Sequence, residues 1–287
     1  GSEGRAAATG QGVICAIIEA LQVFGEGLDL GTKLKGKTMT VQGMGNVGSN
    51  IARIGYQEGA IFQGVSDFPG LIYDKDGINI PELLGRMKRD GMKKAFEDTP
   101  GFVPVGMYIK ITKDGSIDTS NKKKFGYRPV EKGIFKAILE MPVDILTLAF
   151  REGQIVKRNA KRVMAKMVAE GANGPLTPEA DRILEKKGIL VLVDILANIG
   201  GVVVSYFEWL QNLKDEHWHE EVVNKMLAQR MSVSARDVFA CAKQYKVSLR
   251  IGATILALKR IASAMVAKEA ADNIQLRNRV FSGKYTP

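Results

Sequence analysis

A glycine-rich turn between a strand and a helix is the sequence feature that most constrains the fold of this chain. Residues 38–42 (TMTVQ) are typical of a buried strand, and the run Gly43 to Gly48 (GMGNVG) follows them directly. The next residues, from about 47 to 58, have helical spacing and end at Gly59. Glycines at the spacing G-x-G-x-x-G allow a sharp turn from a strand into a helix. The chain is therefore predicted to contain a strand–turn–helix unit of an α/β sheet.

A second strand completes this unit and brings an acidic residue close to the turn. Residues 60–66 (AIFQGVS) predict a buried strand, and Asp67 ends it 19 residues after Gly48. A carboxylate about 20 residues beyond the last glycine belongs to the dinucleotide-binding pattern, where it accepts hydrogen bonds from a ribose. Asp67 would repel a 2′-phosphate, which favours NAD without excluding NADP. A turn or capping aspartate remains the alternative.

Each glycine of the turn has an expected role in holding a dinucleotide. Gly43 would make the tight turn, Gly45 would let the pyrophosphate approach the backbone, and Gly48 would allow close packing of helix on sheet. Asn46 and Val47 lie at the start of the following helix, whose amino-terminal end attracts phosphate. The alternative is an ordinary strand-to-helix turn that binds no ligand.

The rest of the chain continues the alternation of strands and helices. The fold class predicted is α/β: a Rossmann-type, doubly wound, mostly parallel sheet with flanking helices and extra C-terminal helices. Further strands are expected at 143–146, 165–169 and 188–193. Helices are expected at 10–26, 154–162, 178–187, 202–213, 220–245 and 248–270. Residues 271–287 have weak patterning and are expected to be only partly ordered.

The predicted domain organisation has one dinucleotide-binding domain and a helical extension. Residues 1–213 form the Rossmann domain, and residues 214–287 form a C-terminal helical segment that packs on it. A basic insertion interrupts the domain at about 85–136, and alternation around Asp114-Gly115 within 108–118 predicts a β-hairpin there.

Composition narrows the function classes. The net charge of +10 suits an anionic ligand without identifying one. Two cysteines, Cys15 and Cys241, are too few for a disulfide framework. No secretory signal or membrane span is recognised in the sequence. A cytoplasmic location is therefore expected, with the mitochondrial matrix as the alternative.

His217 and His219 have the wrong spacing for a metal site on a helix, so no metal is expected. The basic run 122–124 beside aromatic residues is a weak signal for nucleic acid, without a recognised nucleic-acid motif.

Five motifs together give the chain a resemblance to a known family. They are 1–13 (GSEGRAAATGQGV), 34–48 (LKGKTMTVQGMGNVG), 66–78 (SDFPGLIYDKDGI), 169–181 (AEGANGPLTPEAD) and 194–212 (DILANIGGVVVSYFEWLQN). In this order they resemble the C-terminal NAD(P)-binding domain of glutamate dehydrogenases, within the family of glutamate, leucine, phenylalanine and valine dehydrogenases. The resemblance covers residues 1–84 and 140–213.

The resemblance implies an activity, a sheet variant and partners. It implies oxidative deamination of L-glutamate to 2-oxoglutarate and ammonia, with hydride transfer to NAD(P). The dinucleotide and a small amino acid would be the ligands, and full-length relatives are expected to be homo-oligomers, as hexamers. The family's sheet has one reversed strand.

The resemblance also implies roles for single residues. Thr9 would hold the nicotinamide amide, and Asn46 would lie at the phosphates. Asn173 and Asn198 would lie beside the nicotinamide and its ribose, and Ser205 would bind the side-chain carboxylate of the substrate. Local alternatives remain: Thr9 as a helix cap, Asn173 as an ordinary turn residue, Asn198 as the cap of a helix near residue 200, and Ser205 as a hydroxyl bonded to the backbone.

No catalytic residue is assigned to this chain. The resemblance implies that the catalytic lysine and aspartate belong to an N-terminal substrate domain, which is expected to lie outside residues 1–287. The isolated chain would then bind cofactor and catalyse little.

Four residues depart from the family pattern near the expected nicotinamide position: Leu148, Phe150, Arg151 and Ile199. Larger side chains there would crowd a bound ring. They support a second hypothesis, a degenerate, non-catalytic nucleotide-binding or regulatory domain.

Overall fold

The computed structural model describes the backbone of residues 1–105, 108–111, 117–118, 128–129 and 137–281, and the side chains of residues 1–105 and 137–270. The chain divides into two compact units, Gly1–Arg236 and Asp237–Pro287. Each unit is described by itself. The predicted boundary at residue 213 stays a prediction.

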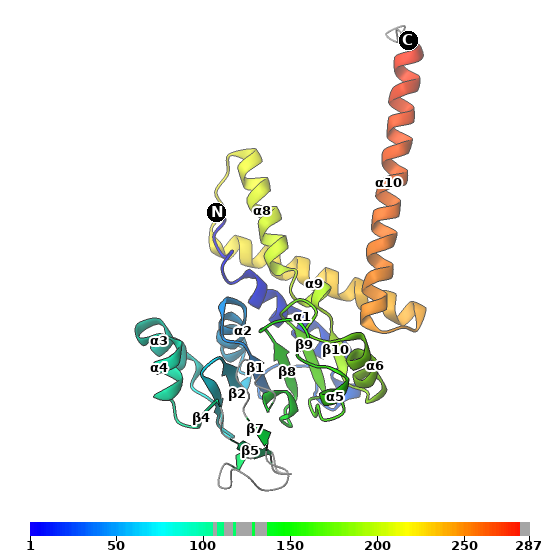
Figure 1. Ribbon diagram of the computed structural model, residues 1–287. Helices are drawn as coiled ribbons and strands as arrows, with labels where there is room; N and C mark the ends of the chain where they lie inside the picture. The colour runs from blue at the N-terminus through cyan, green and yellow to red at the C-terminus, as the bar shows by residue number, and fades with distance from the viewer. Residues whose placement is uncertain (106–107, 112–116, 119–127, 130–136, 282–287) are drawn as a thin grey trace. The chain divides into compact units, whose positions relative to one another are not determined.

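A seven-stranded sheet forms the centre of the first unit (Figure 1). Its strand order is β10-β9-β8-β1-β2-β3-β4. The strands are β1 (Thr38–Gln42), β2 (Ile61–Asp67), β3 (Gly70–Tyr73), β4 (Phe102–Pro104), β8 (Ile145–Leu148), β9 (Met167–Glu170) and β10 (Leu190–Leu192). Neighbours from β10 to β2 are parallel, whereas β3 is antiparallel to both β2 and β4. The mostly parallel α/β sheet and its one reversed strand are therefore confirmed.

Buried aliphatic runs explain why these strands form the core. All four residues of β8 and of β9 are buried, as a parallel sheet covered by helices requires. The predicted starts of these strands at 143 and 165 are wrong by two residues. Before β8, the Asp144 carboxylate accepts hydrogen bonds from the backbone N–H and the hydroxyl of Thr38, at 2.9 and 3.0 Å. The Asp144 side chain thus takes up the donors of Thr38 that the pairing of β1 with β8 would otherwise use. This pairing starts one residue later, at Met39 and Ile145.

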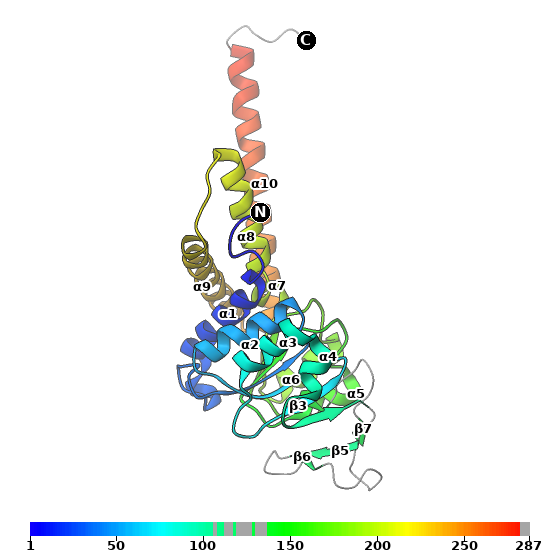
Figure 2. The same cartoon turned by 90° about the vertical axis from the view of Figure 1, so that its left-hand side faces the viewer.

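Helices α1 (Ala8–Phe24) and α2 (Asn46–Gln57) pack against each other and against the sheet, as Figure 2 shows. α2 follows β1 and contacts β1 and β2, whereas α1 contacts β9 and β10. α6 (Pro178–Lys186) also contacts β10, and it contacts the short α5 (Lys157–Ala160). The helix predicted over 154–162 is wrong in length, because residues 154–156 make a bridge and loop contacts instead.

The region of the predicted basic insertion begins with helices on the β3–β4 edge. α3 (Ile80–Asp90) starts before residue 85, and α4 (Met92–Glu97) leads into β4. β5 (Tyr108–Ile111), β6 (Ile117–Asp118) and β7 (Arg128–Pro129) make a separate three-stranded sheet. Antiparallel pairing of β5 with β6 confirms the predicted hairpin. Its turn at Asp114-Gly115 and the run 122–124 lie outside the described residues.

Two helices follow the sheet in the first unit, α7 (Asp194–Ala197) and α8 (Gly200–Lys214), and α9 (Glu220–Tyr245) crosses into the second. Within the first unit, the buried carboxylate of Glu19 on α1 binds Arg236 and Ser232 of α9, at 2.9 and 2.5 Å. The second unit contains α10 (Leu249–Phe281), which pairs with the end of α9 through Arg260 and Asp237. The backbone is helical as far as Phe281, so this helix is longer than the helix predicted over 248–270. The partial order expected for residues 271–287 stays a prediction. Within the described part of the chain, the helices are too short or too polar to cross a membrane.

Glycines allow α1 and α8 to approach each other at backbone distance. A Cβ on Gly12 would lie 3.1 Å from the Cα of Gly200, and a Cβ on Gly200 would overlap the carbonyl oxygen of Ala8. The two helices therefore meet through their backbones and not through side chains. This contact fixes the amino-terminal ends of both helices on the same side of the sheet.

We expect Gly200→Ala to lower the free energy of unfolding by about 1–3 kcal/mol, because the added methyl group forces the backbones of α1 and α8 apart. Gly85→Ala is the matched control, since Gly85 lies inside α3 with its nearest neighbour at 3.5 Å, the end of the Arg89 side chain. That variant should gain about 0.5–1 kcal/mol from the helix preference of alanine. Urea denaturation measures both, and equal stabilities would contradict the close contact.

A second prediction concerns the N-terminal segment. Glu3 accepts hydrogen bonds from the His217 ring at 3.0 Å and the backbone N–H of Glu220 at 2.7 Å, and these contacts lower the pKa of Glu3 below 4.5. A lowered folded-state pKa contributes stability above pH 4.5 that is lost as the pH falls through the folded value. Glu3→Gln should therefore lower the melting temperature at pH 7 and leave it unchanged near pH 2. An equal loss at both pH values would show that the charge of Glu3 is not involved.

Candidate functional site

The glycine turn has the geometry that a phosphate-binding turn requires. Gly43 adopts φ +91°, and a Cβ there would lie 2.7 Å from the carbonyl oxygen of Ala149 at the end of β8. A Cβ on Gly48 would overlap the carbonyl oxygen of Gly43. The fold itself therefore demands glycine at both positions.

Gly45 differs, because the protein does not demand a glycine there. It has an extended conformation with φ −69°, and an added Cβ would have no described atom within 4 Å. Gly45 is also exposed, directly before the first residue of α2. The space beside Gly45 and the partial positive charge at the start of a 12-residue helix together suit an anionic group.

The Asp67 side chain fixes the glycine turn by a hydrogen bond to its backbone. Its side chain is buried, with 7% of the residue exposed. One carboxylate oxygen accepts a hydrogen bond from the backbone N–H of Met44 at 2.5 Å, and the other accepts from Phe68 at 2.6 Å. The contacts predicted for a turn aspartate are thus present. Each carboxylate oxygen retains a second lone pair that can accept from a ribose hydroxyl. The contact of Asp67 with the ribose of a dinucleotide stays a prediction.

A cleft of about 530 Å³ opens at the carboxyl ends of β8 and β9, beside the amino-terminal ends of α1, α2 and α8. Ligands of open α/β sheets bind at this edge, where the strand order reverses. In this sheet the reversal lies between β1 and β8. The cleft is lined by Arg5, Thr9, Val47, Ala149, Phe150, Arg151, Glu152, Gly171, Ala172, Asn173, Asn198, Gly201 and Val202. Four predicted site residues, Thr9, Val47, Asn173 and Asn198, are therefore brought together.

Thr9 and Asn46 connect the first helices to the cleft. α1 begins at Ala8 with Ala7 as its N-cap, so the alternative that Thr9 caps this helix is wrong. The Thr9 hydroxyl lies 2.6 Å from the position of a Cβ on Gly201, which explains the glycine there. Asn46 donates from its side-chain amide to the carbonyl oxygen of Ala6 at 2.8 Å, and so fixes the start of α2 against the segment before α1.

Asn173 and Asn198 form a direct pair across the cleft wall. The Asn198 amide donates to the Asn173 side-chain oxygen at 2.6 Å. α8 begins after Ile199, so the alternative that Asn198 caps this helix is wrong. The pair leaves an amide donor on Asn173 and a carbonyl acceptor on Asn198, a combination that suits a carboxamide or a ribose hydroxyl.

Two carboxylates that were not singled out in the sequence position this pair. Glu170 is fully buried at the end of β9 and accepts a hydrogen bond from the backbone N–H of Asp194 at 2.7 Å. Asp194 in turn accepts from the backbone N–H of Gly174 at 2.8 Å, next to Asn173. A glutamate inside the apolar run 167–170 (MVAE) is the sequence signal that could have identified the first of them.

Ser205 lies on α8 and makes two hydrogen bonds. Its hydroxyl donates to the carbonyl oxygen of Gly201 at 3.0 Å, and accepts from the Arg5 guanidinium at 3.0 Å. The alternative of a hydroxyl bonded to the helix backbone is thus confirmed. The link to Arg5, which lines the cleft, places the hydroxyl next to a cation, and the substrate role stays a prediction.

The four departures from the family pattern fall into two groups. Leu148 is buried within β8, and Ile199 is half-buried at the N-cap of α8; neither lines the cleft. Phe150 and Arg151 do line it, and the volume of about 530 Å³ is that of the cleft with both side chains in place.

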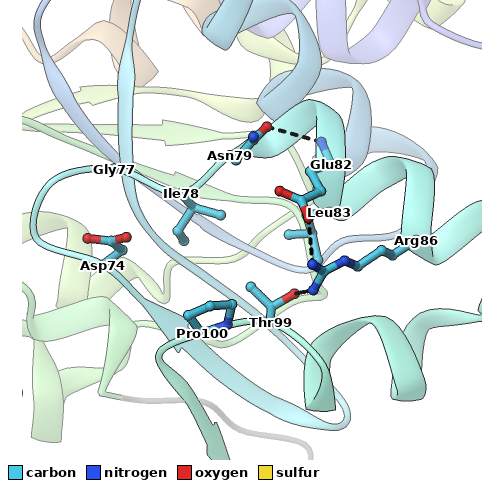
Figure 3. Close-up of a pocket in the computed structure, with 9 residues that line it drawn as sticks. All are labelled: Asp74, Gly77, Ile78, Asn79, Glu82, Leu83, Arg86, Thr99 and Pro100. Carbon is cyan, nitrogen blue, oxygen red and sulfur yellow. Dashed lines mark hydrogen bonds and ion pairs between the residues drawn. The ribbon is translucent and has the colours of Figure 1, made fainter.

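A smaller cavity of about 160 Å³ lies between α3 and the turns around it (Figure 3). Its cation, Arg86, donates to Glu82 at 2.5 Å and to the backbone oxygen of Asp98. Asn79 accepts from the backbone N–H of Glu82 and so caps α3. These polar groups are hydrogen-bonded to one another and stabilise α3. The cavity is therefore not a second candidate ligand site.

The described residues contain no cluster of three His, Cys, Asp or Glu side chains that would hold a metal. His217, one of the two histidines considered for such a site, is bonded to Glu3 instead. Cys15 and Cys241 are both free thiols, and burial raises the pKa of Cys15 to about 11.

The chain matches the family model of the glutamate/leucine/phenylalanine/valine dehydrogenases over residues 1–269. It therefore belongs to this family. It is 41% identical to the glutamate dehydrogenase of Thermotoga maritima over 266 residues, and 35% identical to the NAD-specific glutamate dehydrogenase of Staphylococcus aureus over 265 residues. Each alignment covers 92% of this chain and 55% of the relative.

Solved structures agree with this assignment. The glutamate dehydrogenase of Peptoniphilus asaccharolyticus superimposes with a TM-score of 0.70 at 28% identity, over 93% of this chain and 54% of that one. The hetero-hexameric enzyme of Thermus thermophilus gives a TM-score of 0.73 at 29% identity, over 92% and 54%. The chain thus spans about half the length of the relatives it matches.

We expect Asp67→Asn to lower the free energy of unfolding by about 1–3 kcal/mol, because both carboxylate oxygens accept from backbone N–H groups and an amide has only one oxygen. Ser66→Ala is the neighbouring control. The Ser66 hydroxyl is buried without a hydrogen-bond partner among the described residues, so its removal should change stability by less than about 1 kcal/mol. Thermal unfolding compares the two, and a neutral Asp67→Asn would contradict the supporting role of Asp67.

Proposed function

We propose that this chain is the cofactor-binding part of an NAD-linked glutamate dehydrogenase. The enzyme would convert L-glutamate to 2-oxoglutarate and ammonia. The open position at Gly45 carries the proposal, because the fold demands glycine at Gly43 and Gly48 but leaves Gly45 facing unfilled space at a helix start. The names of the relatives, glutamate dehydrogenase and NAD-specific glutamate dehydrogenase, support the same reading.

The residues around the cleft fit a dinucleotide. The diphosphate would lie against the backbone at Gly45 and the start of α2, as in other glycine-turn sites. Bound NAD would supply a nicotinamide ring that accepts the hydride. Thr9 and the pair Asn173–Asn198 would orient the nicotinamide amide and its ribose by hydrogen bonds, and the Asp67 carboxylate would accept from the adenosine ribose.

The substrate would enter the same cleft beside α8. Ser205 and Arg5 offer a hydroxyl and a guanidinium that suit the side-chain carboxylate of glutamate. The described residues lining the cleft include no lysine, and Glu152 is their one carboxylate. We therefore propose that the general acid–base groups of the complete reaction come from residues other than those that line this cleft.

The preference for NAD and the assembly state belong to the same proposal. A buried Asp67 carboxylate at the end of β2 disfavours a 2′-phosphate, which supports NAD over NADP. We further propose that the enzyme assembles as an oligomer, a proposal supported by the likeness to the hexameric Thermus thermophilus enzyme. That relative is a hetero-hexamer, so the homo-oligomer expected from the sequence stays a prediction. The cytoplasmic location expected from the sequence stays a prediction.

Gly45→Val tests the proposal. The added Cβ enters open space, so the free energy of unfolding should fall by no more than about 1 kcal/mol, the cost of valine in place of glycine at the N-cap of α2. Because the same space would receive the diphosphate, the dissociation constant for NADH should rise about tenfold or more, a loss of at least about 1.4 kcal/mol. Fluorescence titration with NADH and NADPH measures the effect.

Gly27→Val is the matched control, since an added Cβ at Gly27 also meets no described atom within 4 Å and Gly27 lies outside the cleft. It should bind NADH as wild type does. If the wild-type chain binds neither dinucleotide, or if both variants bind like wild type, the proposed cofactor site is wrong.

A further inference from the structure

The loop after β8 lies directly against the glycine turn. A Cβ on Gly43 would lie 2.8 Å from the carbonyl carbon of Ala149 and 2.9 Å from the Cα of Phe150. Ala149 also donates its backbone N–H to the carbonyl oxygen of Gln42 at 2.8 Å, which extends the β1–β8 pairing up to the turn. The side chains that follow in this loop therefore start from a fixed position beside the proposed diphosphate site.

Arg151 is the cation that this loop adds to the cleft. Its guanidinium lies over the Phe150 ring, 5.3 Å from the ring centre, and both residues line the cleft. An aromatic face attracts a guanidinium by a cation–π interaction. The ring thus restricts the position of the charge at the cleft wall.

The other cation that lines the cleft, Arg5, lies next to different helices. Arg5 donates to Ser205 and lies 3.2 Å from the Cβ position of Gly201, so it belongs to the α1–α8 side. Arg151 instead follows β8, the strand paired with β1 at the turn. The cleft is therefore lined by two cations, Arg5 next to α8 and Arg151 in the loop after β8, and by one carboxylate, Glu152.

We propose that Arg151 binds the diphosphate of the dinucleotide, and that Phe150 positions the Arg151 guanidinium for this contact. This inference rests on the proposed function, because it assumes a dinucleotide in the cleft. A guanidinium matches phosphate oxygens by charge and by paired N–H donors. Phe150 and Arg151, both departures from the family pattern, then form part of a working cofactor site.

The test is a titration of the full chain with three ligands: NADH, ADP-ribose and adenosine. Arg151→Leu removes the charge and keeps an apolar side chain. It should weaken NADH and ADP-ribose about tenfold or more, since a hydrogen bond to a charged group is lost, and leave adenosine binding unchanged because adenosine has no phosphate. Added salt should also weaken NADH binding less in Arg151→Leu than in wild type, because the variant lacks one charge that salt can screen.

Arg158→Leu is the matched control, because Arg158 lies exposed on α5 outside the cleft and carries the same charge. It should bind all three ligands like wild type. Phe150→Leu keeps the charge and removes the ring, and is expected to weaken NADH by a smaller factor than Arg151→Leu. Thermal unfolding of each variant checks that the fold is retained.

The outcomes separate this inference from the proposed function. If wild type binds NADH, and Arg151→Leu and Arg158→Leu bind it with equal affinity, the proposed role of Arg151 is overturned and the proposed function is not. Tighter NADH binding by Arg151→Leu would show that the side chain obstructs the cleft, which also overturns it. Wild type that binds neither NADH nor ADP-ribose would overturn both proposals and favour the degenerate-domain hypothesis.

Discussion

The backbone contact at the boundary of β1 and β8 is the constraint on which the rest of the structure depends. Gly43 turns against the carbonyl of Ala149, and Gly48 turns back against Gly43. Side chains at either glycine would separate β1 from β8 or lift α2 from the sheet. The buried carboxylate of Asp67 then fixes the turn through the Met44 N–H. The shape of the turn at Gly43 and Gly48 therefore follows from packing that the fold needs in any case. Gly45, which packing leaves open, is where we propose that the diphosphate binds.

A second close contact brings the remaining cleft residues to this turn. The glycines of α1 and α8 let the two helix starts meet, which sets Thr9 beside Gly201 and Arg5 beside Ser205. The buried Glu170 accepts a hydrogen bond from the backbone N–H of Asp194 and so fixes the start of α7 at the end of β9. Residues more than 160 positions apart in sequence thus line one cleft at the carboxyl edge of the sheet.

Much of this arrangement could be predicted from the sequence, because glycine spacing and buried aliphatic runs are local signals. They predicted β1, α2 and β2 and the residues of the glycine turn. Contacts between distant side chains could not be predicted in this way. Examples are the Asn173–Asn198 pair, the start of β8 after Asp144, and the Asp67 contact with Met44. Each depends on a tertiary hydrogen bond that no periodicity encodes.

Hydrogen–deuterium exchange with and without saturating NADH tests the central claim most directly. If the dinucleotide lies against the glycine turn, the backbone N–H groups of Gly45 to Gly48 and of the loop after β8 should exchange more slowly when NADH is bound. Residues 80–97 on α3 and α4 should exchange at an unchanged rate. Protection confined to α3 and α4, or unchanged exchange at the glycine turn under saturating NADH, would contradict the account.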